Sequence, residues 1–127
     1  MKEKSEIESL EKLIGQLQGL HSELTSLAKK SPSDAVNAFK LKLINKVIVS
    51  GNEVLGKEYR PFEDFEQFDS DDVPSTSDVA MVLGQYMEEA ERYRSDNVTW
   101  HGGNWVYVLG GSPSAIRSGP PSKIGRK

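Results

Sequence analysis

Residues 5–29, SEIESLEKLIGQLQGLHSELTSLAK, decide the fold because they carry the clearest helical pattern in the chain. Apolar residues recur there at alternating spacings of three and four, which predicts an amphipathic helix. Further leucines widen the apolar stripe along one side, so the helix is expected to pack against more than one neighbour, in a helical bundle or a homodimer. The stripe consists of Ile7, Leu10, Ile14, Leu17, His21, Leu24 and Ala28, widened by Leu13, Leu20 and Leu27.

The next residues, KKSPSD at 29–34, are expected to end this helix and to begin a second one. Ser31 is a suitable N-cap, and Pro32 fits the first helical position. The second helix is therefore predicted from about Pro32 to Leu55, with Gly56 as its stop. A strand over the β-branched stretch 43–51 is the competing assignment. The buried face expected for the helix is Val36, Phe39, Leu43, Ile44, Val47, Gly51, Val54 and Leu55.

Two further elements follow in the C-terminal half. Residues 75–97, STSDVAMVLGQYMEEAERYRSDN, have the periodicity of a third helix with Ser77 as its N-cap. Residues 97–111, NVTWHGGNWVYVLGG, place aromatic and β-branched residues on both sides of HGGN, as in a β-hairpin. Beyond Gly110 the chain is rich in Gly, Pro and Ser and ends in basic residues, which predicts a flexible tail.

The predicted fold class is mainly α. Because the connection between the first two helices is short, they are expected to form an antiparallel helical hairpin. A third helix docks on this hairpin, and a small C-terminal β-hairpin and a flexible basic tail complete the chain. Residues 1–110 are then a single helical domain, and residues 111–127 form the Gly/Pro/Ser-rich tail.

Composition excludes several kinds of chemistry. The 127 residues include no cysteine, so disulfides, thiolate metal sites and a cysteine nucleophile are excluded. No apolar run is long enough to span a membrane, and the N-terminal residues do not have the pattern of a signal peptide. We therefore expect a small soluble protein located in the cytoplasm.

The net charge of −3 is distributed unevenly along the chain. Residues 58–78 contain eight acidic side chains and one basic side chain, which gives −7, whereas the sequences before and after each carry +2. Such a concentration of charge can steer a basic partner. A well-solvated connector, with its charge balanced by basic neighbours, is the alternative.

The acidic–aromatic segment, residues 60–78, places Phe62, Phe65 and Phe68 three positions apart among acidic side chains. One interpretation is that the rings fold back over the first two helices, because a small domain needs its large apolar side chains in the core. The second is that they bind a protein partner, with Asp69, Asp71 and Asp72 in an acidic rim. A third, imitation of a phosphate backbone, needs negative charge over a broader face.

A calcium site in the same segment is not supported. An EF-hand loop that starts at Asp69 requires an acidic or amide side chain at position five, glycine at position six and glutamate at position twelve. Those positions are occupied by Val73, Pro74 and Ala80. We expect no metal and no other cofactor.

The stretch WHGGNW, residues 100–105, is the other candidate for partner binding. Trp100, His101 and Trp105 meet at one predicted turn, and exposed tryptophans often mark binding surfaces. The alternative is that the tryptophans cover the helical core.

No arrangement of a nucleophile with a base, and no phosphate-binding loop, is evident, so an enzyme is not expected. The sequence favours a non-enzymatic protein-interaction module, such as a small regulator, inhibitor, antitoxin or assembly subunit. The alternative is a nucleic-acid-associated regulator that uses basic residues of the second helix and of the tail. Those residues are Lys40, Lys42, Lys46, Arg117, Lys123, Arg126 and Lys127.

Overall fold

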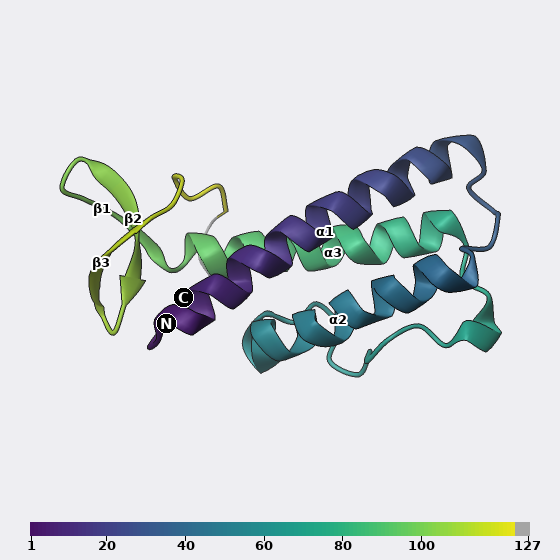
Figure 1. The fold of residues 1–127 in the computed structure, drawn as a ribbon, viewed down its shortest axis with the longest axis horizontal. Coiled ribbons are helices and arrows are strands. Elements are labelled where there is room, and N and C mark those ends of the chain that lie inside the picture. The colour runs from purple at the N-terminus through teal and green to yellow at the C-terminus, as the bar shows by residue number, and fades with distance from the viewer. Residues whose placement is uncertain (124–127) are drawn as a thin grey trace.

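The computed structural model describes residues 1–123 as three helices followed by an antiparallel sheet of three strands (Figure 1). The predicted mainly α fold, with an antiparallel helical hairpin and a docked third helix, is confirmed. Arg126 and Lys127 of the predicted tail lie outside the described residues. The elements are α1 (Lys4–Lys30), α2 (Ala38–Tyr59), the short 3₁₀ helix η1 (Ser70–Asp72), α3 (Thr76–Ser95), β1 (Val98–His101), β2 (Asn104–Leu109) and β3 (Ser112–Arg117).

Helices α2 and α3 run in the same direction, and both are antiparallel to α1 (Figure 1). The first turn of α3 therefore lies beside the turn that joins α1 to α2. There the N–H groups of Thr76 and Ser77 donate to the carbonyl oxygens of Asp34 and Pro32, at 2.9 and 3.2 Å. Because α3 starts at this end of the bundle, residues 60–75 run back along α2, which requires a long and largely extended connection.

The second helix begins at Ala38, so the predicted start at Pro32 is wrong. Asn37 is the N-cap, and its side chain accepts a hydrogen bond from the N–H of Lys40 at 2.8 Å. Ser31, the predicted N-cap, ends α1 instead. The physical reason is that the carbonyl groups of this turn are used to satisfy the first N–H groups of α3, which have no partner within their own helix.

The other predicted helix ends are close to the observed ones. Gly56 interrupts the regular helix with φ 66° and ψ −173°, as its role as a stop predicts, although one further turn follows. The predicted N-cap Ser77 is wrong, because α3 starts at Thr76 and its N-cap is Ser75. The Oγ of Ser75 accepts from the N–H of Asp78 at 3.2 Å. Ser75, Thr76 and Ser77 all carry hydroxyl groups that can cap a helix, so residue type alone does not select Ser75.

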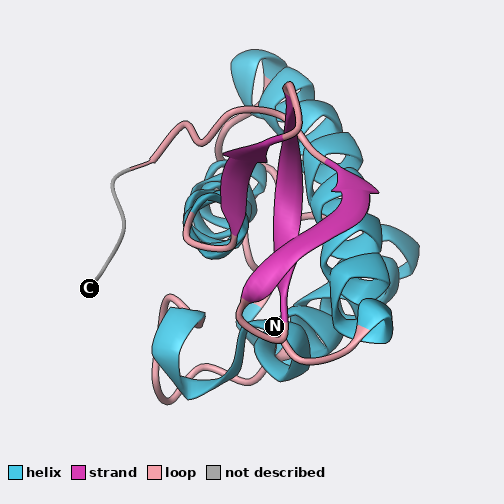
Figure 2. Cartoon of the chain, turned by 90° about the vertical axis from the view of Figure 1, so that its left-hand side faces the viewer, coloured by secondary structure: helices cyan, strands magenta, loops and turns pink. Residues whose placement is uncertain are grey.

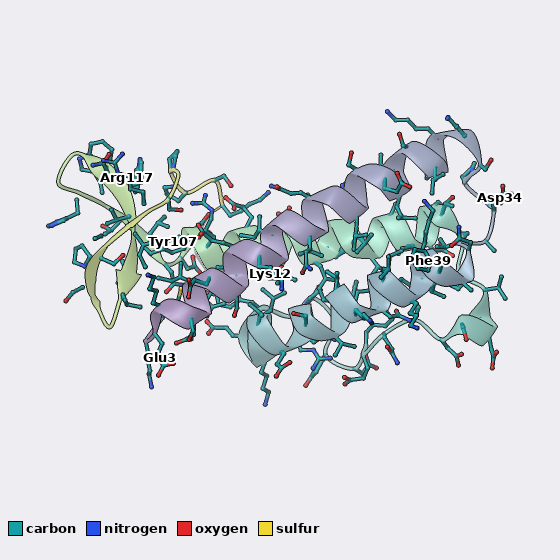
Figure 3. The ribbon with its side chains drawn as sticks, in the orientation of Figure 1. Glu3, Lys12, Asp34, Phe39, Tyr107 and Arg117 are labelled. Atoms are coloured by element: carbon teal, nitrogen blue, oxygen red, sulfur yellow. The ribbon has the colours of Figure 1, made fainter. Side chains whose placement is uncertain are left out.

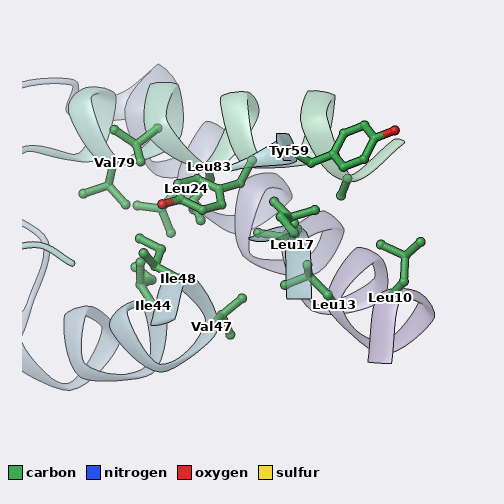
Figure 4. Close-up of a cluster of buried hydrophobic side chains, with 14 of the residues drawn as sticks. Leu10, Leu13, Leu17, Leu24, Ile44, Val47, Ile48, Tyr59, Val79 and Leu83 are labelled. Carbon is green, nitrogen blue, oxygen red and sulfur yellow. The ribbon is translucent and has the colours of Figure 1, made fainter. Parts of the chain in front are cut away.

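The core lies between the three helices, and α1 packs most extensively against α3. The side chains of the core come from the apolar stripes of the three helices. The stripe predicted for α1 therefore does form its buried face. No helix within residues 1–123 is both long enough and apolar enough to cross a membrane. Figure 4 labels Leu10, Leu13, Leu17 and Leu24 of α1, Ile44, Val47, Ile48 and Tyr59 of α2, and Val79 and Leu83 of α3.

The sheet consists of two successive hairpins with order β1-β2-β3. The turns Gly102–Gly103 and Gly110–Gly111 have positive φ at both residues (60° and 82°, 61° and 81°), which defines type I′ turns and explains the glycine pairs. The predicted flexible tail is therefore wrong for Ser112–Arg117, which form the third strand. Pro113 is tolerated there because it lies opposite Val108, next to the hydrogen-bonded pair at the turn, where no N–H is needed.

The sheet lies across the end of the bundle at which α1 begins and α3 ends (Figure 2). Tyr107 of β2 is fully buried in the core, and this burial raises the pKa of its hydroxyl to about 12. The chain start is tied to the same place, because the N–H of Gly110 donates to the carbonyl of Met1 at 2.7 Å. Figure 3 shows Tyr107 near the helices and Arg117 on the sheet away from them.

Residues 118–123, which were also predicted to be flexible, are held on α3. The guanidinium of Arg94 donates to the carbonyl oxygens of Gly119 and Pro120, at 2.9 and 2.7 Å. Glu91 accepts from the hydroxyl of Ser122 and forms an ion pair with Arg94 at 2.6 Å. These contacts hold the pKa of Glu91 below its ordinary value, chiefly through the hydrogen bond from Arg94.

Candidate functional site

The three phenylalanines of the acidic–aromatic segment are half-buried and pack against the core. Their rings form a chain of edge contacts that starts at Tyr86 of α3. The ring centroids are 6.5 Å apart for Tyr86 and Phe62, 6.1 Å for Phe62 and Phe65, and 5.2 Å for Phe65 and Phe68. Edge-to-face contacts of this kind are favourable. The rings therefore act as a clasp that covers the helices.

Two asparagines of α2 fix the backbone of this clasp. Asn45 forms a reciprocal pair with Phe68, accepting from its N–H at 2.9 Å and donating to its carbonyl at 3.0 Å. Asn52 donates to the carbonyl of Phe65 at 3.0 Å and accepts from the hydroxyl of Tyr86 at 2.7 Å. Burial raises the pKa of Tyr86, while the bond to Asn52 opposes this shift. The segment is thus held by polar as well as apolar contacts.

The acidic side chains of the segment point away from the clasp. Asp69, Asp71 and Asp72 are all exposed, and Asp69 caps η1 by accepting from the N–H of Asp71 at 2.9 Å. Arg60, the only basic residue among residues 58–78, donates to the carbonyl of Phe65 at 2.8 Å. The structure therefore separates the two halves of this candidate site, with rings inward and carboxylates outward.

The tryptophans predicted to meet at one turn do so. Trp100 and Trp105 are cross-strand partners in β1 and β2, and their rings are 5.7 Å apart in an edge-to-face arrangement. Trp100 is 60% exposed and Trp105 is half-buried beside it. His101 is exposed at the end of β1 and lies opposite Asn104 across the Gly–Gly turn. We call the strands β1 and β2 with this turn the Trp hairpin.

The three strands of the sheet contain no acidic residue. No acidic residue occurs from position 97 onward, and Arg117 and Lys123 are the charged residues in the described part of that range. Arg117 lies exposed on β3, opposite Val106 of β2. The paired tryptophans on a sheet without acidic residues thus contrast with the acidic–aromatic segment, whose carboxylates are exposed along α2.

Within residues 1–123, the basic residues proposed for nucleic-acid contact come from α2, from β3 and from the stretch that follows the sheet. Lys40 forms an ion pair with Glu23 of α1, and Lys123 pairs with Glu88 of α3 at 2.9 Å. Lys42 and Lys46 are exposed on α2. Within residues 1–123 no cluster of three or more His, Asp or Glu side chains is placed to hold a metal ion.

A groove that the sequence does not predict follows the junction of α1 and α2. At one end is a hollow of about 460 Å³, lined by Leu20, Phe39 and Leu43. At the other end is a hollow of about 630 Å³, lined by Leu13 and Val54 together with polar side chains. Both follow the same two helices, and we call them together the α1–α2 groove. Figure 3 shows Phe39 at the start of α2 and Lys12 further back along α1.

The groove corrects two predicted core positions. Phe39 is 71% exposed and Leu43 is 42% exposed, although the sequence pattern places both on the buried face of the second helix. The inward face of α2 is instead set by Leu41, Ile44 and Ile48, whose spacing is also helical. Phe39 and Leu43 are four positions apart, so they share a side of α2, and that side lies away from the face of Leu41, Ile44 and Ile48.

The chain matches no family model, no curated protein and no solved structure, so its function has to be inferred from the contacts described above.

Proposed function

We propose that this chain is a cytoplasmic, non-enzymatic protein-interaction module that binds a protein partner through the Trp hairpin. A small regulator, inhibitor, antitoxin or assembly subunit fits this description. The observation that carries the proposal is the exposure of Trp100, which is 60% accessible although its ring is supported by Trp105. A large aromatic side chain in a fixed position binds with little loss of conformational entropy, which makes tryptophan a frequent hot spot.

The edge of the sheet suggests how the partner is bound. In a hairpin with a two-residue turn, the pairs flanking the turn alternate between hydrogen-bonded and non-bonded, starting with a bonded pair. His101 and Thr99 therefore bond to β2, while the N–H and C=O groups of Val98 and Trp100 point away from it. An extended segment of the partner can add to this edge of β1 as a further strand.

Hydrogen exchange tests that geometry in the free protein. The amide protons of Val98 and Trp100 should exchange faster than those of Thr99 and His101, because only the latter pair bonds to β2. Equal protection of all four amides would show that the edge is already occupied and would contradict strand addition.

The proposed site is tested by comparing two equally exposed side chains. Trp100→Ala should reduce capture of partners from the native source by at least about tenfold, the loss expected for a hot spot. Met81 of α3 is also 60% exposed but lies on a helix, so Met81→Ala is the matched control and should leave capture unchanged. Equal losses for both variants would contradict a site at the Trp hairpin.

Nucleic-acid binding is the alternative function for the same chain. It is disfavoured by the ion pairs that engage Lys40 and Lys123. The exposed carboxylates of the acidic–aromatic segment, which runs along α2, also disfavour it. A gel-shift assay with DNA and RNA at low salt distinguishes the two, because binding to phosphates weakens steeply as salt increases. We expect no shift at about 50 mM salt, where phosphate binding is strong.

A further inference from the structure

The α1–α2 groove is a second surface feature, separate from the Trp hairpin. Its two hollows adjoin, because Leu20 follows Gln16 by one turn on α1 and Val47 follows Ile44 by about one turn on α2. The groove therefore extends over several turns of two packed helices. Phe39 rises from the narrower end, with 71% of its surface exposed.

The groove contains both a protruding apolar side chain and a hollow that can receive one. Phe39 and Leu43 project at the narrow end, whereas the larger hollow of about 630 Å³ is lined by the apolar side chains of Leu13 and Val54 together with polar and charged ones. An interface with two-fold symmetry uses the same patch on both subunits, so the patch has to contain its own complement. The groove meets this requirement for shape.

The charges along α2 meet the same requirement. Lys42 and Lys46 lie in its first half and Glu53 in its second half, and none of the three forms an ion pair within residues 1–123. Two copies of α2 placed antiparallel bring the half with Lys42 and Lys46 opposite the half with Glu53, in which Glu53 and Glu58 outweigh Lys57. Such pairs favour this orientation over the parallel one.

We propose that the α1–α2 groove is the interface of a two-fold homodimer in which the two copies of α2 lie antiparallel. With the symmetry axis near the middle of α2, Phe39 of one copy reaches the hollow lined by Leu13 and Val54 of the other. In the same register Lys42 faces Glu53 of the second copy. The additional leucines that widen the apolar stripe of α1, among them Leu20, lie beside this contact. They would be covered by the second copy.

Sedimentation equilibrium of the purified chain tests the dimer. The wild-type protein should sediment as a dimer, and Phe39→Ser should raise the dimer dissociation constant by at least about tenfold, because each copy loses the exposed ring that enters the hollow of the other. The fold should be retained, since Phe39 contributes little to the core of one subunit. Met81→Ser is the matched control on another exposed surface and should leave the dimer intact.

Charge reversal tests the antiparallel register. Lys42→Glu and Glu53→Lys should each weaken the dimer, and the double variant should restore it, with circular dichroism confirming the helices in all three. A wild-type chain that remains monomeric up to about 1 mM, a concentration at which a dissociation constant of the same size already gives a large share of dimer, would overturn the proposal. So would a dimer that is unaffected by Phe39→Ser, or a double variant that fails to restore it.

Discussion

The acidic–aromatic segment and the Trp hairpin both place aromatic side chains three to five positions apart, yet the structure uses them in opposite ways. In the first, the rings of Phe62, Phe65 and Phe68 point toward the core, and the backbone is held by two asparagines. In the second, Trp100 rests on Trp105 and remains largely exposed. Aromatic residues in a polar background therefore indicate a binding surface only when the local backbone directs their side chains toward solvent.

The largest effect is expected from removing the rings of the clasp together. Replacing Phe62, Phe65 and Phe68 by Ser should cost about 6 kcal/mol, taking about half of the 3–5 kcal/mol typical of a buried phenylalanine for each half-buried ring. This is comparable to the whole stability of a small domain, so the helical signal in circular dichroism should be lost. A folded triple variant would show that the rings are not part of the core.

The polar half of the clasp should have the next largest effect. Asn52→Ala leaves the buried hydroxyl of Tyr86 and the carbonyl of Phe65 without their partner, which should cost about 1–3 kcal/mol. Urea unfolding measures this loss. Gln67→Ala, an exposed side chain of the same segment, is the control and should change the free energy of unfolding by less than about 0.5 kcal/mol.

The attachment of residues 118–123 to α3 should depend on pH. Because the folded state lowers the pKa of Glu91, its ionised form stabilises the fold above the ordinary carboxyl pKa of about 4.3, and this contribution is lost as the pH falls through the folded-state pKa. Glu91→Gln should therefore be less stable than the wild type at pH 7, and the difference should be smaller at pH 3. Urea midpoints at the two pH values measure the difference, and a constant difference would contradict this assignment.

The smallest effect on stability is expected at the Trp hairpin. Trp100→Ala removes one cross-strand aromatic contact and little buried surface, so the free energy of unfolding should fall by about 0.5–1 kcal/mol. The melting temperature and the urea midpoint measure it. A loss as large as that of Asn52→Ala would place Trp100 in the structural framework and remove the contrast between the two aromatic segments.

Much of the fold could be predicted from local sequence patterns. The stripe of α1, the stop at Gly56 and the first Gly–Gly turn each follow from spacing or backbone preference, and each is found. The errors occur where distant residues compete for the same groups. The turn before α2 is used to cap α3, and the second Gly–Gly pair forms a turn only because β2 is present to pair with Ser112–Arg117.

The candidate site could be predicted only in part for the same reason. The pairing of Trp100 with Trp105 follows from a two-residue turn between them and is local. The direction of the phenylalanine rings depends on Asn45, Asn52 and Tyr86, which no sequence pattern connects to residues 60–78. The exposure of Phe39 is not evident from the sequence, because α2 has a second apolar face with helical spacing, and that face is the one that packs against the other helices.

The shared direction of α2 and α3 has a consequence for the rate of folding. A bundle in which each helix reverses the last can assemble by successive local steps, but here α3 docks on α1 only after the connection has returned to the far end. The sheet then closes against Met1, about a hundred residues away along the chain. Contacts between such distant parts of the chain slow folding, so this small protein should fold more slowly than an up-and-down three-helix bundle of equal length.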